Sequence, residues 1–294
     1  MAKVKLIIDS DCNLEKGLAE QYGAIVVPST IIVDGQEYKD GFTITPRDIY
    51  RLSSVKGKPL PKTSAINEAD FYEPFRKALA EYDGAVFITI SAALSSSYRN
   101  AMMAIQALNV QDRIVAIDTK SLSCGIAIVA ERAAADIAKG FPLMAMKKDL
   151  DDVAARTTVE FVIDTLDNLY KGGRCSGLSY IFGKALHIHP VIGMDPVGHL
   201  FPLHKVRGKD IGNGVEQIFQ DFKKDWDEDN VDKTLPVYCT HAAADPWERL
   251  ATAKVKALVG NQMVVRNSEA SSVIAVHCGP GTFGIGWTRK KPNA

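Results

Sequence analysis

The chain lacks a long hydrophobic run, and this absence excludes a membrane-spanning protein of the usual helical kind. No apolar stretch among the 294 residues approaches the roughly 20 residues that a membrane-spanning helix requires. The apolar run Leu6–Ile8 is too short for the core of a secretory signal peptide, and no cleavage site follows it. The sequence therefore predicts a cytoplasmic protein without integral membrane association.

Paired cysteines are lacking too. The five cysteines are odd in number and scattered, and no Cys-x-x-Cys pattern occurs. Reduced thiols in a cytoplasm fit this pattern better than a disulfide framework does.

The chain also lacks an excess of charge of either sign, with 35 Lys and Arg against 35 Asp and Glu. This balance argues against a general nucleic-acid binder, although it permits a local basic patch. The length and the 46% hydrophobic content permit a sizeable core, in one large domain or two of middling size.

The common nucleotide, hydrolase and metal motifs are missing. No Walker loop, G-x-S-x-G elbow or H-E-x-x-H motif occurs. Residues 279–284 match G-x-G-x-x-G, but no crossover helix or ribose-binding acid follows them. His187 and His189 would share one face of a strand, without the further ligands that a metal site needs. We therefore expect no cofactor and no metal.

Strand and helix patterns alternate in the first half, which is typical of βαβ units and a parallel sheet. The predicted strands there are Lys5–Asp9, Ala24–Val27, Ala85–Ile90 and Arg113–Ile117. In the second half, strands and helices come in blocks. The predicted strands are Glu160–Ile163, Ile188–Ile192, Leu200–Arg207, Pro236–Cys239 and Val273–His277, and the predicted helices are Val215–Lys224 and Trp247–Val259. We predict the α/β class with two domains, a Rossmann-like parallel-sheet domain (1–155) and an α+β domain (156–294).

Small polar residues gather where the first-half strands end. Ligands of open parallel sheets bind beyond the carboxyl ends of the strands. Asp9-Ser10, Ser91 and Asp118-Thr119 follow three of these strands, either as ligand-binding groups or as helix caps. Further hydroxyls stand at Ser95, Ser96 and Ser97, before a predicted helix, and at Thr63 and Ser64. Hydroxyls beside a helix N-terminus suit a carboxylate or a phosphate.

These residues resemble the DegV family of bacterial fatty-acid-binding proteins, in family order over about 280 residues. The matching segments are Ile8-Asp9-Ser10, Asp34-Gly35, Lys62-Thr63-Ser64, Leu94-Ser95, Asp118-Thr119, Asp164-Thr165-Leu166, Gly172-Gly173-Arg174-x-Ser176, Lys205-Val206-Arg207 and His277-x-Gly279-Pro280-Gly281. The chain departs from the family pattern at Ala65-Ile66, Ser96-Ser97 and His189-Pro190.

The resemblance implies the EDD fold, with a long-chain fatty acid such as palmitate held between two domains and its acyl chain in an apolar tunnel of the first. It implies a carboxylate site whose candidate residues are Thr63, Ser64, Ser91, Ser95, Ser96, His277 and Gly279. It also implies a carrier that performs no catalysis and presents its ligand to a separate fatty acid kinase, which would dock at Arg174 and Arg207.

A second hypothesis is an acyl hydrolase. Ser95 or Ser91 would be its nucleophile and His277 its base, with Asp9 or Asp118 orienting the ring. The absent nucleophile elbow speaks against this alternative.

Overall fold

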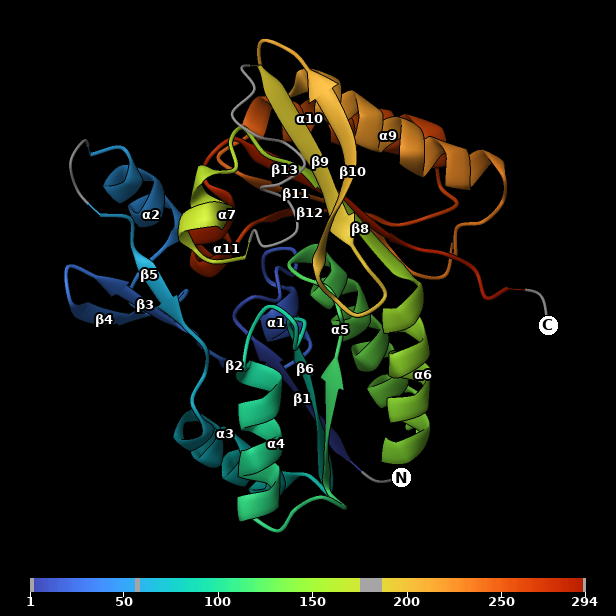
Figure 1. Cartoon of the computed structure of the whole chain (residues 1–294). Helices are drawn as coiled ribbons and strands as arrows, with labels where there is room; N and C mark the ends of the chain where they lie inside the picture. Colours follow the sequence, from blue (N-terminus) through green and yellow to red (C-terminus); the bar gives the residue numbers. More distant parts are fainter. Residues whose placement is uncertain (1–2, 56–58, 175–186, 293–294) are drawn as a thin grey trace.

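The structure is a computed structural model that describes residues 3–55, 59–174 and 187–292. The two larger sheets lie one above the other in the view of Figure 1, and each has helices packed on it. The lower sheet is parallel and the upper one is mixed, so the α/β fold class predicted from the sequence is confirmed. No helix of the described residues is long and apolar enough to cross a membrane.

The lower sheet is built from the predicted first-half strands. Its order is β2 (Ile25–Val27), β1 (Val4–Asp9), β6 (Gly84–Thr89) and β7 (Ile114–Asp118). Four helices cover its two faces, α3 (Glu68–Glu81) and α4 (Ser97–Ala107) on one and α5 (Cys124–Ala138) and α6 (Leu143–Arg156) on the other. Leu6 and Ile8 pack in the core under α5 and α6, whereas Ile7 packs under α3 and α4. Burial on both faces explains the continuous apolar runs of these strands.

A small antiparallel sheet stands beside the lower one and was not predicted. Its order is β4 (Gln36–Lys39), β3 (Thr30–Val33) and β5 (Lys62–Ser64), with α2 (Pro46–Ser53) next to it. Ile31 of β3 and Ile49 of α2 pack with Val273 and Val276 from the far end of the chain. This contact brings the hydroxyls of β5 close to the predicted C-terminal site.

The upper sheet has six strands. Its order is β10 (Leu200–Arg207), β9 (Ile188–Met194), β8 (Thr157–Val162), β13 (Thr282–Thr288), β11 (Val237–Ala242) and β12 (Val265–Glu269). Helices α9 (Gly212–Asp227) and α10 (Asp245–Val259) pack on one face, around a core that includes Phe222 and Trp287. Two short helices, α1 (Leu18–Gln21) and α7 (Asp167–Lys171), lie outside the sheets. The strand latest in sequence, β13, lies in the interior of this sheet.

The predicted strand Val273–His277 is wrong, because these residues lie in the helix α11 (Ser272–Cys278). Ser271 caps this helix by accepting a hydrogen bond from the Ile274 amide at 3.3 Å. The run is buried on all sides, and a short continuous apolar run fits a buried helix as well as a strand. The next strand, β13, was missed because glycines 284 and 286 interrupt its pattern.

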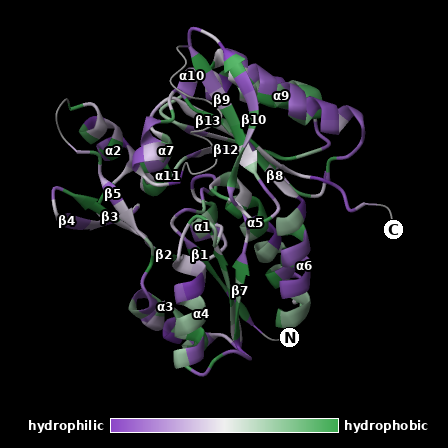
Figure 2. Ribbon diagram, in the orientation of Figure 1, coloured by the Kyte–Doolittle hydropathy of each residue, from purple (hydrophilic) through white to green (hydrophobic). Residues whose placement is uncertain are grey.

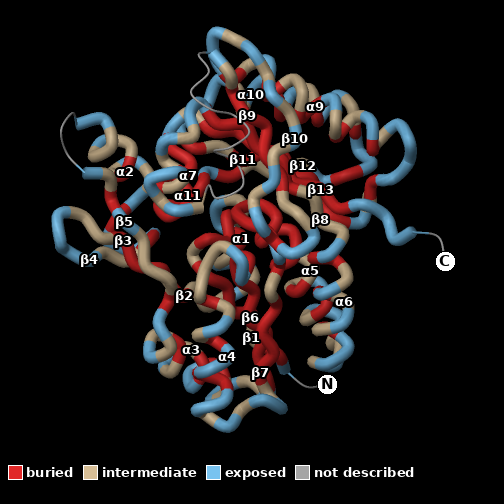
Figure 3. The backbone as a smooth tube through the Cα atoms, in the orientation of Figure 1, coloured by how far each residue is buried: buried red, intermediate tan, exposed pale blue. Residues whose placement is uncertain are grey.

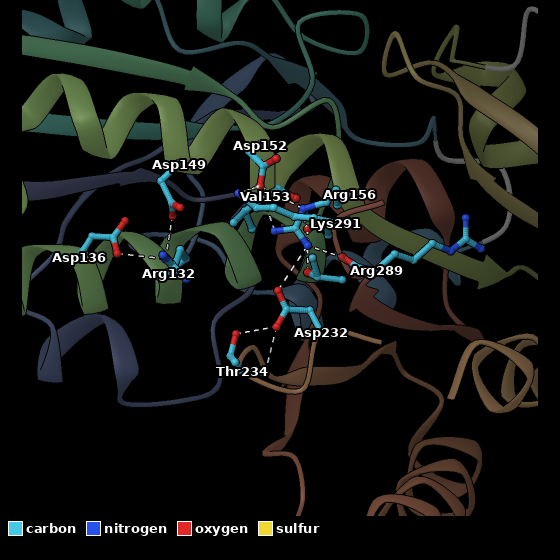
Figure 4. Close-up of polar contacts among 12 residues, drawn as sticks. Arg132, Asp136, Asp149, Asp152, Val153, Arg156, Asp232, Thr234, Arg289 and Lys291 are labelled. Carbon is cyan, nitrogen blue, oxygen red and sulfur yellow. Dashed lines mark hydrogen bonds and ion pairs between the residues drawn. The ribbon is translucent and has the colours of Figure 1, made fainter. Parts of the chain in front are cut away.

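The strands of the lower sheet and the central strands of the upper one are largely hydrophobic and buried (Figures 2 and 3), and one apolar core extends from the lower sheet through α5 to β8. Polar contacts also join the two halves. Arg156 at the end of α6 pairs with Asp152 and with Asp232 of the second half, and Arg132 pairs with Asp136 and Asp149 (Figure 4). These ion pairs fix α5 and α6 against each other and against the upper sheet.

Candidate functional site

A cavity with an empty volume of about 570 Å³ lies between the two halves. Polar side chains line part of it, namely Thr63, Ser64, Ser95, Arg174 and His277. Apolar side chains line much of the rest, namely Ile90, Leu94, Leu122, Phe161, Leu169, Leu200, Val273, Ile274 and Cys278. The cavity therefore suits a ligand with a polar group and an apolar body.

Thr63 and His277 form the polar contact at the centre of this site. The Oγ1 of Thr63 lies 2.8 Å from Nε2 of His277, although 214 positions separate them in sequence. The other ring nitrogen, Nδ1, is buried and has no hydrogen-bond partner in the described part of the chain. A Cβ at Gly172 would lie 2.2 Å from this Nδ1, so the approach of α7 to the ring requires glycine there.

Arg174 provides a positive charge next to the His277 ring. Burial and the charge of Arg174 lower the pKa of His277 to about 4, so the ring is neutral near pH 7. The guanidinium donates to the carbonyl of Gly172 over 2.6 Å and to that of Leu94 over 3.4 Å. Since a guanidinium carries five N–H groups, further donors remain for an anion.

The second hydroxyl of the site comes from the start of α4. Ser95 Oγ lies 3.0 Å from Ser97 Oγ, which in turn accepts a hydrogen bond from the Ile66 amide at 3.3 Å. Ser64 also lines the cavity, and its hydroxyl donates to the carbonyl of Ala65 over 3.4 Å. These contacts fix β5 and the start of α4 relative to each other.

Three of the predicted carboxylate-site residues do not line the cavity. Ser91 is fully buried and donates to the carbonyl of Gly198 over 2.8 Å. The Ser96 hydroxyl accepts from Arg99 at 3.2 Å. Gly279 has a φ of 79° and its backbone passes next to the Asn168 side chain.

The remaining predicted residues lie apart from the His277 ring. Asp9 accepts from Thr89 at 2.6 Å and from the Ile90 amide at 2.7 Å, and Asp118 accepts from the amides of Ala92 and Lys120. Arg207 is exposed on β10. Ser176, part of the matching pattern, lies outside the described residues.

The sequence analysis did not identify two further polar residues of the cavity, Asp11 and Ser29. Both are buried. Asp11 follows the end of β1, so the rule that singled out Asp9 could have found it as well. Ser29 carried no comparable signal, since it precedes a strand that was not predicted.

Two other spaces adjoin the cavity. An outer one of about 1330 Å³ shares Thr63, Arg174 and His277 with it and is also lined by Lys62 and Lys171. An inner one of about 320 Å³ shares Leu122, Phe161, Ile274 and Cys278 with it. The polar site thus lies between a basic outer space and an apolar inner one.

Within residues 3–55, 59–174 and 187–292, no group of three or more His, Cys, Asp or Glu side chains is arranged to hold a metal ion. His187 is exposed, whereas His189 is buried with its Nδ1 3.4 Å from a carboxylate oxygen of Asp164. The two histidines therefore do not share one environment.

Comparison with known proteins gives a consistent result over nearly the whole chain. The family model described as "Uncharacterised protein, DegV family" matches residues 3–290. A DegV domain-containing protein of Clostridium perfringens is 30% identical over 292 residues, which cover 98% of this chain and 99% of the relative.

Solved structures of similar fold include two whose descriptions state a ligand. One is described as "Fatty Acid Binding of a DegV family Protein from Thermus thermophilus", with 27% identity, a TM-score of 0.87, and coverage of 99% of this chain and 100% of the other. Another is a fatty acid (stearic acid)-binding protein from Eubacterium ventriosum, with 25% identity, a TM-score of 0.86, and coverage of 99% of both chains.

Proposed function

Because this chain belongs to the DegV family, we propose that it binds a long-chain fatty acid such as palmitate or stearate and performs no chemistry on it. The observation that carries the proposal is the Thr63–His277 contact of 2.8 Å, located in the polar part of a cavity that is otherwise largely apolar. Its relatives from Thermus thermophilus and Eubacterium ventriosum are described as fatty-acid-binding proteins.

The carboxylate would accept hydrogen bonds from Thr63 and Ser95. Arg174 would balance its charge, since His277 is neutral near pH 7. Hydrogen bonds between a charged acceptor and such donors are the stronger kind. This role for Arg174 differs from the partner-docking role that the resemblance implied.

The acyl chain would extend from the cavity into the inner space, past the four side chains that line both. This route lies between the two sheets, because Leu122 precedes α5 of the first half and Phe161 belongs to β8 of the second. A palmitate chain buries about fifteen methylene or methyl groups, worth roughly 12 kcal/mol gross. Association costs of roughly 4–15 kcal/mol offset much of this, so the head-group contacts matter for affinity.

The hydrolase hypothesis has less support. A serine hydrolase needs the base bonded to its serine and an acid bonded to the other ring nitrogen. Here Nε2 of His277 faces Thr63, Ser95 faces Ser97, and Nδ1 has no partner among the residues that the structure describes. A histidine with a pKa of about 4 is also a weak base near neutral pH.

The basic outer space suggests how the ligand is presented. Lys62, Lys171 and Arg174 line it, and a separate fatty acid kinase with an acidic face would dock over this opening and towards Arg207. We also propose that the chain divides into two domains at 155/156. A cytoplasmic location is proposed as well, and the four described cysteines, which are free and buried, favour it.

Native mass spectrometry and lipid extraction of protein purified without added ligand test this function. We expect one fatty acid per chain, and a melting temperature that rises with added palmitate. Replacing Thr63 and Ser95 together by Ala should weaken palmitate binding at least tenfold, since each lost bond to a charged group costs about 1.5–3 kcal/mol.

A Ser96→Ala variant is the matched control, because Ser96 does not line the cavity. Absence of bound lipid together with no thermal response to palmitate would refute the proposal. Labelling of Ser95 by a fluorophosphonate, lost in His277→Ala, would favour the hydrolase instead.

A further inference from the structure

A second group of polar side chains lines the same cavity and has no part in binding the carboxylate as proposed above. Asp11 and Ser29 are 2% and 3% exposed. The Asp11 carboxyl accepts from Ser29 Oγ and from Ser271 Oγ, each at 3.4 Å. Both contacts are near the long limit of a hydrogen bond, so the Asp11 carboxyl keeps unused hydrogen-bonding capacity.

This polar pair is separated from the carboxylate site along α11. Ser271, which contacts Asp11, caps the start of that helix, and His277 lies near its other end. Six residues of α-helix span about 9 Å at about 1.5 Å per residue. The cavity residues Val273 and Ile274 lie between these two positions in sequence. A ligand whose carboxylate lies at Thr63 and Ser95 would therefore meet Asp11 and Ser29 with its acyl chain.

The charge around Asp11 limits the polar group that could bind there. Burial and the neighbouring Asp9 and Asp40 raise the pKa of Asp11 well above its usual range. The same neighbours oppose a second anion at this position. The Asp11 carboxyl accepts hydrogen bonds whether or not it carries a proton, and a serine hydroxyl donates one and accepts others. A hydroxyl group on the ligand is therefore the best complement.

We propose that Asp11 and Ser29 recognise a hydroxyl group on the acyl chain several carbons beyond the carboxylate, so that the preferred ligand is a hydroxylated long-chain fatty acid. The inference rests on the proposed function, because it concerns the same cavity and the same carboxylate site. A plain acyl chain offers no partner for the hydrogen-bonding capacity that Asp11 and Ser29 keep beside their long contacts, whereas a hydroxyl group on the chain does.

Isothermal calorimetry with stearate and a series of hydroxystearates, with the hydroxyl on successive carbons, tests the inference. At least one isomer with its hydroxyl several carbons beyond the carboxylate should bind about three- to tenfold more tightly than stearate, as one additional neutral hydrogen bond predicts. The isomer with the hydroxyl next to the carboxylate should show no such gain.

Variants then locate the preference. Asp11→Leu should bring the affinity ratio of the preferred isomer to stearate close to one, whereas Asp11→Asn should retain it. Ser64→Ala, which removes a different hydroxyl of the cavity, is the matched control and should leave the ratio unchanged. Melting curves establish folding, and Ser29→Ala replaces Asp11→Leu if that variant does not fold.

The outcomes separate this inference from the proposed function. If stearate binds and no hydroxystearate binds more tightly, only the inference is overturned. A preference that survives both Asp11→Leu and Ser29→Ala would also overturn it. If neither stearate nor any hydroxystearate binds, the proposed function fails as well.

Discussion

His277 is held by contacts from two other segments of the chain, β5 and residues 172–174 after α7. Thr63 of β5 bonds its Nε2, Gly172 leaves room for its Nδ1, and Arg174 lies close enough to lower its pKa. The ring is therefore buried in its neutral form. His277 should therefore contribute to the pH dependence of stability.

The contribution of His277 to the stability of the ligand-free protein should fall as the pH drops from about 6.5 to about 4. In this window the unfolded chain protonates His277 and the folded chain does not, because the folded pKa is about 4 against 6.5. The associated loss of unfolding free energy is roughly 3 kcal/mol. Above about 6.5 this stabilising contribution is fully present.

Urea unfolding across this pH range compares the wild type with His277→Gln. The variant should lose less stability on acidification, by that same roughly 3 kcal/mol. His199→Gln is the control, since the His199 side chain is 60% exposed. A wild type and His277→Gln with parallel pH profiles would contradict the neutral buried ring.

Among the elements, the turn between β9 and β10 contacts the lower sheet at one residue. Gly198 has a φ of 95°, and its carbonyl accepts the hydrogen bond from Ser91. A Cβ at this position would lie 2.1 Å from Ser91 Oγ and 3.1 Å from the Lys120 backbone. The contact therefore requires glycine for both conformation and space.

Replacing Gly198 by Ala should cost roughly 2–4 kcal/mol of unfolding free energy, combining backbone strain and a steric clash. Gly35→Ala is the matched control, because Gly35 also has a positive φ, of 83°, but no atom lies within 4 Å of its Cβ position. It should cost about 1–2 kcal/mol. Equal losses in denaturant melts would show that the turn does not press on the lower sheet.

The first-half strands and helices could be predicted because their apolar periodicity is local. The strands of the small sheet were not predicted, being three or four residues long. β3 and β4 form a hairpin at Asp34-Gly35, a local signal that was missed, whereas β5 pairs with β3 across about thirty positions. The run Val273–His277 was read as a strand because burial on all sides removes the periodicity that distinguishes a helix.

The candidate site was predictable in part. Thr63, Ser95 and His277 came from the ordered resemblance, and the cavity contains all three, but their role in binding stays a prediction. Ser91 is turned towards Gly198, which no local pattern reveals. Arg174 was assigned to partner docking from the resemblance, and that role stays a prediction; that it lines the cavity could not be read from the sequence alone.

At the scale of the whole molecule, a partly buried network joins the halves that enclose the cavity. Arg266 of β12 bonds Glu131 of α5 at 3.1 Å and Glu15 at 3.0 Å. Glu131 also accepts from Tyr22 at 3.1 Å and from Tyr238 at 2.5 Å. This network fixes α5 against the upper sheet.

Replacing Arg266 by Met should lower the unfolding free energy by roughly 2–4 kcal/mol, because two partly buried carboxylates lose their shared cation. Fatty acid should also leave the protein faster, as the cavity walls belong to both halves. Lys254→Met breaks the exposed pair with Glu216 and should cost under about 1 kcal/mol. Chemical denaturation measures the unfolding free energy, and stopped-flow release of a fluorescent fatty acid measures the rate of ligand loss. Equal changes in the Arg266→Met and Lys254→Met variants would contradict a role of Arg266 in holding the two halves together.

The interior place of β13 has a consequence for how the protein is made. Every other strand of the upper sheet leaves the ribosome before β13 does. Because β13 pairs with β8 on one side and with β11 on the other, these two strands stay unconnected until β13 is made. Until then the nascent chain presents two sheet fragments with open edges, which are templates for association with other chains. A ribosome that stalls shortly before residue 282 would therefore release a product prone to aggregation and to capture by chaperones and proteases.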